Sequence, residues 1–522
     1  MMNGGRIGTG FATVLTFLAA TYVAVSVLLD RGNTVGSFFF YAMVGGGIVG
    51  ALAPRLSFSF FLVELALLDG VKRMMVFAGN VEQIDLFWVL GIAPVTLAGI
   101  FTGVVIRMLL GQIPPEQGDI QRLMAVAALN VLFVGISLIK GNGIGGTLRE
   151  VANGSFYSVL LFLVPVLFRT TGDAVGVLRL TIFIFVPVAL YGVYQLAYGF
   201  QAYEIDYLKQ GLSIEMKQLE ADRVRAFSTL NSPTALGSVT GLLSGLCLVM
   251  AWYRSRSGRS ILTPFVAILC GLIFFAGMVS STSRSDFAAI PVIALSAWAF
   301  PSAGRTRFVY AVAIGSFLTL IFSSTWLLSR LDEFNRMIAG NYAQGSFIAL
   351  MSAVGSYSDR LVGFSTVLIN PAAWSILGID SGTGESGYRV HDPLSELLLH
   401  YGAVGIIMVI LFAIVALRLM HRQLLRIQDP WGKRLSATML GMVFSLVLVS
   451  MVSGTRFTVF PINTFVWMLA GIHLVIVQHE SRIRRALAEV DSSEDECPQM
   501  AVETPKPQPT IGTGRFGPVV RA

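Results

Sequence analysis

Charged residues are scarce in this sequence. Only 13% of its 522 residues are Asp, Glu, Lys or Arg, whereas 54% are hydrophobic, and the mean hydropathy is +0.72. A soluble domain ordinarily carries about 25% charged residues. The shortage therefore excludes a soluble globular protein of this size and predicts a chain that lies in lipid.

Cysteine and histidine are also rare. Cys247 and Cys270 lie within apolar runs and Cys497 lies near the C-terminus, which excludes an external disulfide framework. The five histidines form no convincing ligand cluster with loop carboxylates, so we expect neither a metal ion nor another cofactor. We see no repeat with a period of about 20 to 50 residues and no obvious sequence match between the two halves of the chain.

Long apolar runs fill most of the chain. About 20 such residues cross a hydrocarbon core of about 30 Å, and in lipid a helix satisfies its own backbone hydrogen bonds. The runs that we expect to span are Phe11–Leu29, Val35–Ala53, Leu86–Leu110, Leu123–Ile139, Ser155–Phe168, Leu178–Tyr198, Ala235–Tyr253, Ile261–Ser280, Asp286–Phe300, Phe308–Thr325, Gly402–Met420, Thr438–Val452 and Phe460–Val477. We therefore predict an all-α integral membrane protein of about 12 to 14 transmembrane helices.

One further apolar run, Leu56–Ala78, is ambiguous. Glu64, Asp69, Lys72 and Arg73 interrupt it, and charges within a span are costly. Counting the run as a crossing gives a total of about 14 spans.

Short basic loops give the expected orientation. They are Arg254–Arg259, Arg305–Arg307, Arg418–Arg434 and, after the last span, Arg482–Arg485. Basic loops of this kind stay in the cytoplasm. Two spans separate the first loop from the second, and two separate the third from the last, so each pair lies on the same side. We expect a multi-pass protein of the bacterial inner membrane with both termini in the cytoplasm. The net charge of +7 then comes mostly from the excess of basic residues in these cytoplasmic loops and does not indicate nucleic-acid binding.

Parity leaves two long segments outside, residues 201–230 and the loop 326–401. We expect residues 1–478 to form one membrane domain. Residues 479–522 contain an acidic run and three prolines, so they should form a disordered cytoplasmic tail. Arg6 precedes the first run as in a signal peptide, but no small-residue cleavage site follows, so we interpret this run as a retained span.

His391 is the one histidine that we expect within the long outer loop, because His400 lies at the start of the next span. Asp392 and Pro393 directly precede the apolar run Leu394–Leu399, the order of an N-cap and an N1 proline at a helix start. A helix N-terminus disfavours the imidazolium form and attracts anions such as phosphate. His391 is thus suited to act as a general base beside a phosphate. The alternative is that Asp392 only caps the helix and His391 is only exposed.

Four arginines fall on the outer side, where positive charge is normally scarce: Arg225, Arg284, Arg360 and Arg456. Each could pair with Asp286, Asp359 or lipid headgroups. Together they favour an anionic ligand at the outer membrane surface, because forked guanidinium groups suit a diphosphate well.

Three motifs resemble those of the O-antigen ligase and O-antigen polymerase family. His391-Asp392, nine residues, then Gly402-x-x-Gly405 resembles the family's His-Asn, nine residues, Gly-x-x-Gly signature. Arg225–Pro233 with Leu236-Gly237 resembles its outer Arg segment, and Ser281–Arg284 its Thr-x-Ser-Arg turn. The similarity covers roughly residues 225–477. It departs from the family at Asp392, where Asn, Ser or Gln is usual, so an amide contact to sugar or phosphate is lost or changed.

The resemblance implies an integral-membrane glycosyltransferase with a GT-C-like fold, a long periplasmic loop and a polyprenyl-diphosphate-linked oligosaccharide as donor. It implies that Arg225 and Arg284, with Arg360, hold the diphosphate and that His391 takes the proton from the acceptor hydroxyl. The supporting residues would be Asp392, Gly402, Gly405 and Arg456. Stabilised leaving-group charge would remove the need for a metal ion.

Several activities stay open. A polymerase would join repeat units of an O-antigen, capsular polysaccharide or exopolysaccharide, with a chain-length regulator as its expected partner, whereas a ligase would move finished glycan onto a lipid A core. The variant Asp392 favours the polymerase. Outside this class stands a transporter or flippase of lipid-linked sugar, for which internal repeats and ionisable residues in mid-span would be typical.

Overall fold

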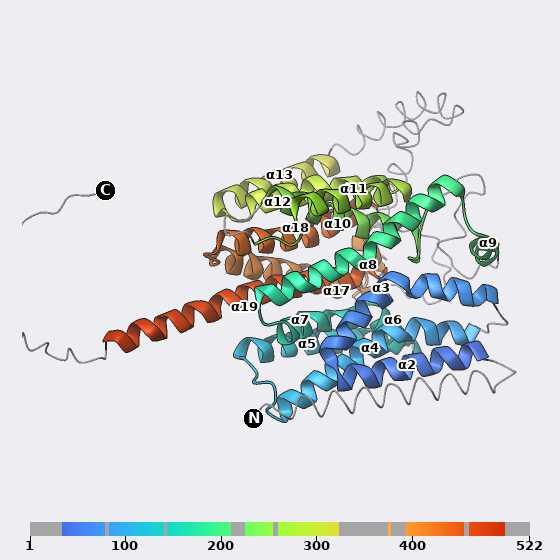
Figure 1. The fold of residues 1–522 in the computed structure, drawn as a ribbon, viewed down its shortest axis with the longest axis horizontal. Coiled ribbons are helices and arrows are strands. Elements are labelled where there is room, and N and C mark those ends of the chain that lie inside the picture. The colour runs from blue at the N-terminus through green and yellow to red at the C-terminus, as the bar shows by residue number, and fades with distance from the viewer. Residues whose placement is uncertain are drawn as a thin grey trace, which may run out of the picture. The chain divides into compact units, whose positions relative to one another are not determined.

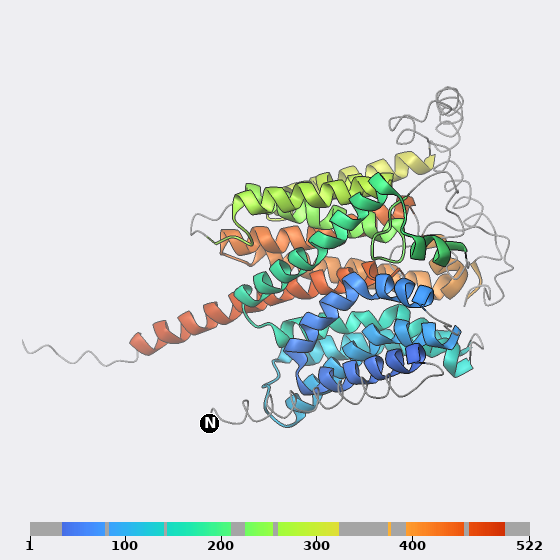
Figure 2. The same cartoon turned by 45° about the vertical axis from the view of Figure 1, so that its right-hand side comes forward.

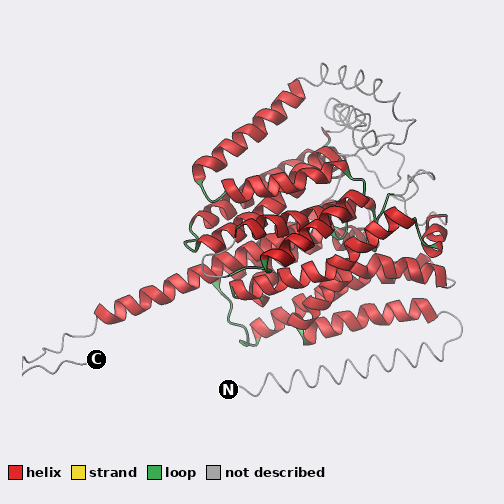
Figure 3. Cartoon of the chain, turned by 45° about the horizontal axis from the view of Figure 1, so that its top comes forward, coloured by secondary structure: helices red, strands yellow, loops and turns green. Residues whose placement is uncertain are grey.

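A computed structural model describes residues 34–78, 83–139, 143–209, 225–253, 259–322, 374–376, 393–453 and 459–495. Within these ranges every regular element is a helix (Figure 3). The chain divides into two compact units, residues 1–479 and 480–522. Of the second unit, the structure describes only helical residues, 480–495.

The helices before the Arg225 segment belong to the first half of the chain. They are α2 (Thr34–Leu52), α3 (Pro54–Ala78), α4 (Gln83–Leu109), α5 (Gln117–Ile139), α6 (Gly143–Asn153), η1 (Ser155–Val159), α7 (Leu160–Leu167), α8 (Thr171–Tyr198) and α9 (Ala202–Lys209). The long helix α8 starts with a reciprocal capping box between Thr170 and Asp173, and Gly199, at φ 81°, ends it.

The remaining helices follow the Arg225 segment. They are α10 (Pro233–Trp252), α11 (Pro264–Ser280), η3 (Arg284–Ala288), α12 (Ala289–Ala299), α13 (Ala303–Phe322), α17 (Pro393–Leu425), α18 (Pro430–Ser453) and α19 (Ile462–Asp495). Figures 1 and 2 show α8 between α10 to α13 on one side and the group α2 to α7 on the other, with α3 and α11 among its neighbours. Phe185 of α8 and Phe465 of α19 pack edge to face in the shared core.

The apolar runs that the sequence marks in the described ranges coincide with helices, and the all-α architecture is confirmed there. Among the described residues, seven helical stretches have the length and composition to cross a membrane: Trp88–Leu109, Gly118–Ile139, Thr171–Tyr198, Pro233–Trp252, Gly402–Leu425, Pro430–Ser450 and Ile462–Glu489. Shorter apolar helices cover Gly36–Leu52, Ser155–Leu167, Pro264–Ser280 and Ser285–Ala299. The predicted span Phe11–Leu29 lies outside the described residues.

The ambiguous run forms the single helix α3, which has 25 residues and is therefore about 37 Å long. Near its start, Arg55 donates to the carbonyl oxygen of Leu167, and near its end Arg73 donates to that of Ser228. Asp69 and Arg73 are almost wholly buried. The charges that interrupt the apolar run therefore make contacts inside the protein.

One end of the first unit carries the residues that flank the predicted cytoplasmic turns, and we call it the basic end. Arg259, just before α11, lies 3.4 Å from Asp429, just before α18. Arg434 donates to the carbonyl oxygen of Ala297 at 2.6 Å and lies over the ring of Tyr253 at the end of α10. The ends of α10, α12 and α17 and the starts of α11 and α18 therefore meet here.

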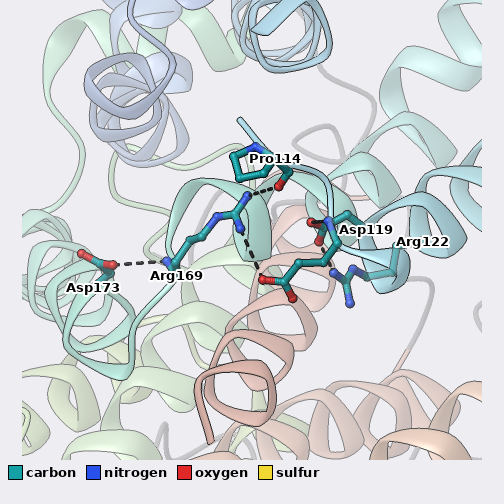
Figure 4. A network of polar contacts seen from close by, with 6 residues as sticks. Pro114, Asp119, Arg122, Arg169 and Asp173 are labelled. Carbon is teal, nitrogen blue, oxygen red and sulfur yellow. Dashed lines mark hydrogen bonds and ion pairs between the residues drawn. The ribbon is translucent and has the colours of Figure 1, made fainter. Parts of the chain in front are cut away.

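A second polar network joins the α4–α5 loop to the start of α8 (Figure 4). Arg169 contacts Glu116 Oε1 at 3.3 Å and donates to the carbonyl oxygen of Pro114 at 3.1 Å, and its backbone N–H donates to Asp173. Arg122 pairs with Asp119. The network holds two loops together, and we assign it a structural role.

The predicted disordered tail is wrong for residues 479–495, because α19 continues through them as helix. The sequence from Arg482 to Val490 is rich in Arg, Ala, Leu and Glu, which are good helix formers. Residues 496–522 lie outside the described part of the chain. The first compact unit ends at His479, one residue after the predicted end of the membrane domain.

Candidate functional site

Two segments that the sequence singles out lie against each other. The backbone N–H of Ala226 donates to the carbonyl oxygen of Ser280 at 3.2 Å. Arg225 Nε donates to Thr282 Oγ1 at 3.0 Å, although the two residues are 57 positions apart. The Arg225 side chain stays exposed. The predicted Arg segment and the predicted Thr-x-Ser-Arg turn therefore form one surface, which we call the Arg225 end.

This surface lies at the end of the first unit away from the basic end. Helix α10 starts directly after the Arg225 segment, and its last residues reach Tyr253 under Arg434 at the basic end. Its 20 residues correspond to about 30 Å. The Arg225 end and the basic end are thus separated by one helix length.

Both segments contain a strained residue. Ser228 has φ 54° and Thr282 has φ 53°, and they are the non-glycine residues with positive φ in the described ranges. The left-handed region is unfavourable for residues with a Cβ, above all for a β-branched threonine. Such conformations persist only where the surroundings fix them, and they cluster at functional sites. This outlier pair independently marks the surface that the sequence motifs mark.

Buried hydrogen bonds fix Ser228. Its N–H donates to Gln195 Oε1 at 2.7 Å, its hydroxyl donates to the carbonyl oxygen of Val188 at 2.5 Å, and its own carbonyl oxygen accepts from Arg73 Nη2 at 2.5 Å. Ser228 is fully buried. Arg225, three residues earlier, is therefore carried on an immobilised backbone.

The start of α10 packs against the turn after α11. Ser232 caps α10 by accepting from the N–H of Ala235, and Pro233 occupies the first turn. Ser238 donates to Asp286 Oδ1 at 3.0 Å. A Cβ atom at Gly237 would lie only 2.4 Å from Asp286 Oδ2, so the turn can approach α10 because position 237 is glycine.

Replacing Gly237 by alanine should separate these elements. We expect a destabilisation of about 1–3 kcal/mol, because overpacking a buried contact forces the neighbours to shift. Gly176→Ala in α8 is the matched control, since a Cβ there meets nothing within 4 Å and alanine favours a helix. The thermal unfolding midpoints of both purified variants measure the effect. Equal midpoints would contradict the close approach.

Helix α17 contains the predicted Gly-x-x-Gly element. Gly402 has φ 65° and breaks the helix into two parts, and Gly405 is buried. The N–H groups of Ala403 and Val404, next to the break, donate to the carbonyl oxygens of Ser375 and Ile376 at 2.9 and 3.3 Å. The positive φ at position 402 thus explains why the first residue of the motif is glycine. The break also frees the next two N–H groups, which bond α17 to residues 375 and 376.

The structure describes only part of the predicted site. His391, Asp392, Arg360 and Arg456, and most of the loop 326–401, lie outside the described residues. Arg284 begins η3, two positions after Thr282, but its side chain also lies outside them. Helix α17 begins at Pro393, as the sequence predicts, so His391 stands two residues before that helix.

Sequence reasoning missed the residues that support Arg225. From the sequence, Arg73 was only a charge that interrupts an apolar run, although it bonds Ser228. No sequence pattern marked Gln195, which bonds Ser228, or Glu204, which bonds Gln195. A charge inside a run of 20 or so apolar residues is itself a sign of a buried contact. Within the described ranges, the structure contains no group of three His, Cys, Asp or Glu side chains that could hold a metal ion.

No model of a known protein family matches this chain, and a search of curated proteins gave no match.

Proposed function

We propose that this protein is an integral-membrane glycosyltransferase that moves a polyprenyl-diphosphate-linked glycan onto a sugar hydroxyl at the outer face of the bacterial inner membrane. Polymerisation of polysaccharide repeat units is the activity that we favour. The observation that carries the proposal is the contact of Arg225 Nε with Thr282 Oγ1, at the end of the bundle away from the basic turns. It supports a joint role for two segments that were chosen from sequence alone.

The Arg225 end suits an anion. A guanidinium carries a permanent positive charge and donates in a fork that matches phosphate oxygens. The contact with Thr282 and the buried bonds of Ser228 hold this charge in place before any ligand arrives. Preorganised charge of this kind stabilises the charge that develops in a transition state, with no reorganisation during the reaction.

In the proposed reaction the acceptor hydroxyl oxygen attacks the anomeric carbon of the donor glycan. A new glycosidic C–O bond forms while the bond from that carbon to the diphosphate oxygen breaks, and the diphosphate leaves with the electron pair. His391 takes the hydroxyl proton, and Arg225, with Arg284 and Arg360, stabilises the leaving group. The protein residues thus supply both the base and the leaving-group charge.

Two other functions compete. A ligase would use the same donor and a lipid A core as acceptor. A transporter of lipid-linked sugar is favoured by Glu64 of α3, whose Oε1 accepts from Thr96 at 3.0 Å while Oε2 is buried with no hydrogen-bond partner among the described residues. Ionisable groups buried in a span are typical of transporters.

One assay separates the three functions. Purified protein in detergent is incubated with a lipid-linked repeat unit alone, then with a lipid A core added. A parallel reaction with a chelator tests the expectation that transfer needs no metal ion. A ladder of longer lipid-linked products from the repeat unit alone supports the polymerase, and product that requires the core supports the ligase. Absence of any new glycosidic product, with uptake of the substrate by proteoliposomes, would establish the transporter instead.

A further inference from the structure

We infer that Gln195 is a positioning residue for Arg225, and that Glu204 sets the orientation of Gln195. The inference rests on the proposed function, because it explains how the diphosphate-binding arginine is held. It concerns residues of α8 and α9, outside all three sequence motifs.

Gln195 joins α8 to the Arg225 segment through both ends of its side-chain amide. Its Oε1 accepts from the backbone N–H of Phe227 at 3.1 Å and from that of Ser228 at 2.7 Å. Its Nε2 donates to Glu204 Oε1 at 2.6 Å. Gln195, Phe227, Ser228 and Glu204 are all fully buried. The amide can therefore take only one orientation, since a flip would place its NH₂ against two N–H donors.

Glu204 completes the chain of bonds on the other side. Its Oε2 accepts from the backbone N–H of Gln201, at the start of α9, at 3.0 Å. Both carboxylate oxygens thus have a donor. A route of hydrogen bonds runs from the start of α9 through Glu204 and Gln195 to the two peptide groups beside the left-handed residue Ser228.

Arg73 holds the opposite side of the same turn. Its Nη2 donates to the carbonyl oxygen of Ser228, and its guanidinium lies 4.3 Å from the centre of the Phe227 ring. With acceptors on one side and a donor on the other, the strained turn is over-determined. Losing the Gln195 oxygen would leave two buried N–H groups without a partner, so the turn should relax and carry Arg225 out of place.

The Gln195–Glu204 pair permits an exchange test. Gln195→Glu alone places two buried carboxylates next to each other. Glu204→Gln alone leaves only one side-chain oxygen at position 204 for two N–H donors, so one donor loses its acceptor. In the double variant, the carboxylate at position 195 accepts from both N–H groups. The amide at position 204 then donates to that carboxylate and accepts from the N–H of Gln201. The bonds of the pair to each other, to Gln201 and to the Arg225 segment are restored, and the net charge of the pair is unchanged.

Two readouts measure the result on folded protein: the dissociation constant of farnesyl diphosphate as a soluble probe, and hydrogen exchange of a peptide that covers residues 225–232. Each single variant should weaken probe binding by about 10-fold or more, as expected for buried charge-assisted bonds, and should speed exchange. The double variant should return to within about threefold of the wild type in binding. A contribution to global stability alone would speed exchange across the whole chain and would leave probe binding by the folded single variants unchanged.

The outcomes separate the inference from the proposed function. Arg225→Ala serves as the reference for diphosphate binding. If that variant weakens probe binding but the double variant rescues neither readout, the positioning role is wrong and the function stands. If exchange is lost and rescued as expected but Arg225→Ala binds the probe normally, Gln195 does hold the segment, and the diphosphate assignment of Arg225 fails.

Discussion

Replacing His391 by alanine should lower glycan transfer by about 100- to 10,000-fold, the usual contribution of a general base. The acceptor hydroxyl would then attack without a group to take its proton. In the sequence His391 precedes the first residue of α17 by two positions, and we expect the positive end of a helix to disfavour the charged imidazolium there. The protein should stay folded, because a predicted loop side chain adds little to helix packing. Initial rates with purified protein and lipid-linked donor measure the effect.

His400→Ala is the control for this variant, since it removes another histidine of the same region nine residues further on. Its loss of rate should be mild. Thermal unfolding of both variants should match the wild type, which separates chemistry from folding. Near-normal transfer by His391→Ala would remove this general base from the mechanism, although the protein would still be a transferase.

Replacing Arg225 by alanine should lower transfer by about 100- to 1,000-fold, the usual cost of removing one preorganised group that stabilises transition-state charge. Arg225→Lys should recover little of it. A lysine has no Nε–H to donate to Thr282 Oγ1 while also presenting a fork to the diphosphate. Initial rates over a range of donor concentrations show whether binding, turnover or both are lost.

Two further variants control this prediction. Arg305→Ala removes an exposed arginine at the basic end, where its guanidinium lies over the ring of Trp298, and should leave transfer nearly unchanged. Thr282→Ser keeps the hydroxyl acceptor and should retain most activity, whereas Thr282→Val removes the acceptor and should lose more. Equal rates for Arg225→Ala and the wild type would exclude Arg225 from the site.

The helices could be predicted from sequence because the hydrophobicity of each apolar run is a local property of its own residues. The charge-poor composition and the runs of about 20 apolar residues placed both ends of α10 to within two residues and the end of α8 at Tyr198, although α8 starts at Thr171, before the predicted run. Pro393 likewise marked the start of α17. The small helices α6 and α9 were not predicted, because at 11 and 8 residues they are too short to leave such a run.

The candidate site could be predicted only as a set of separate motifs. The sequence contains the Arg225 segment and the Ser281–Arg284 turn, but nothing local in it says that Arg225 donates to Thr282. Gly237 was part of a sequence motif, but the sequence did not explain why this position is glycine. The structure does, because a Cβ there would lie only 2.4 Å from Asp286 Oδ2. Contacts of this kind depend on which helices become neighbours.

By itself, the sequence determined that the chain contains apolar helices long enough to cross a membrane and where most of the described helices lie, because these follow from local hydrophobicity and from backbone hydrogen bonds made within a segment. Only the tertiary structure decided that Asp69 and Arg73 of α3 are buried, that Ser228 and Thr282 take left-handed conformations, and that Gln195 bonds both Glu204 and the backbone of Ser228. A buried polar group must find its partner wherever the fold brings one, and that partner is usually far away in sequence.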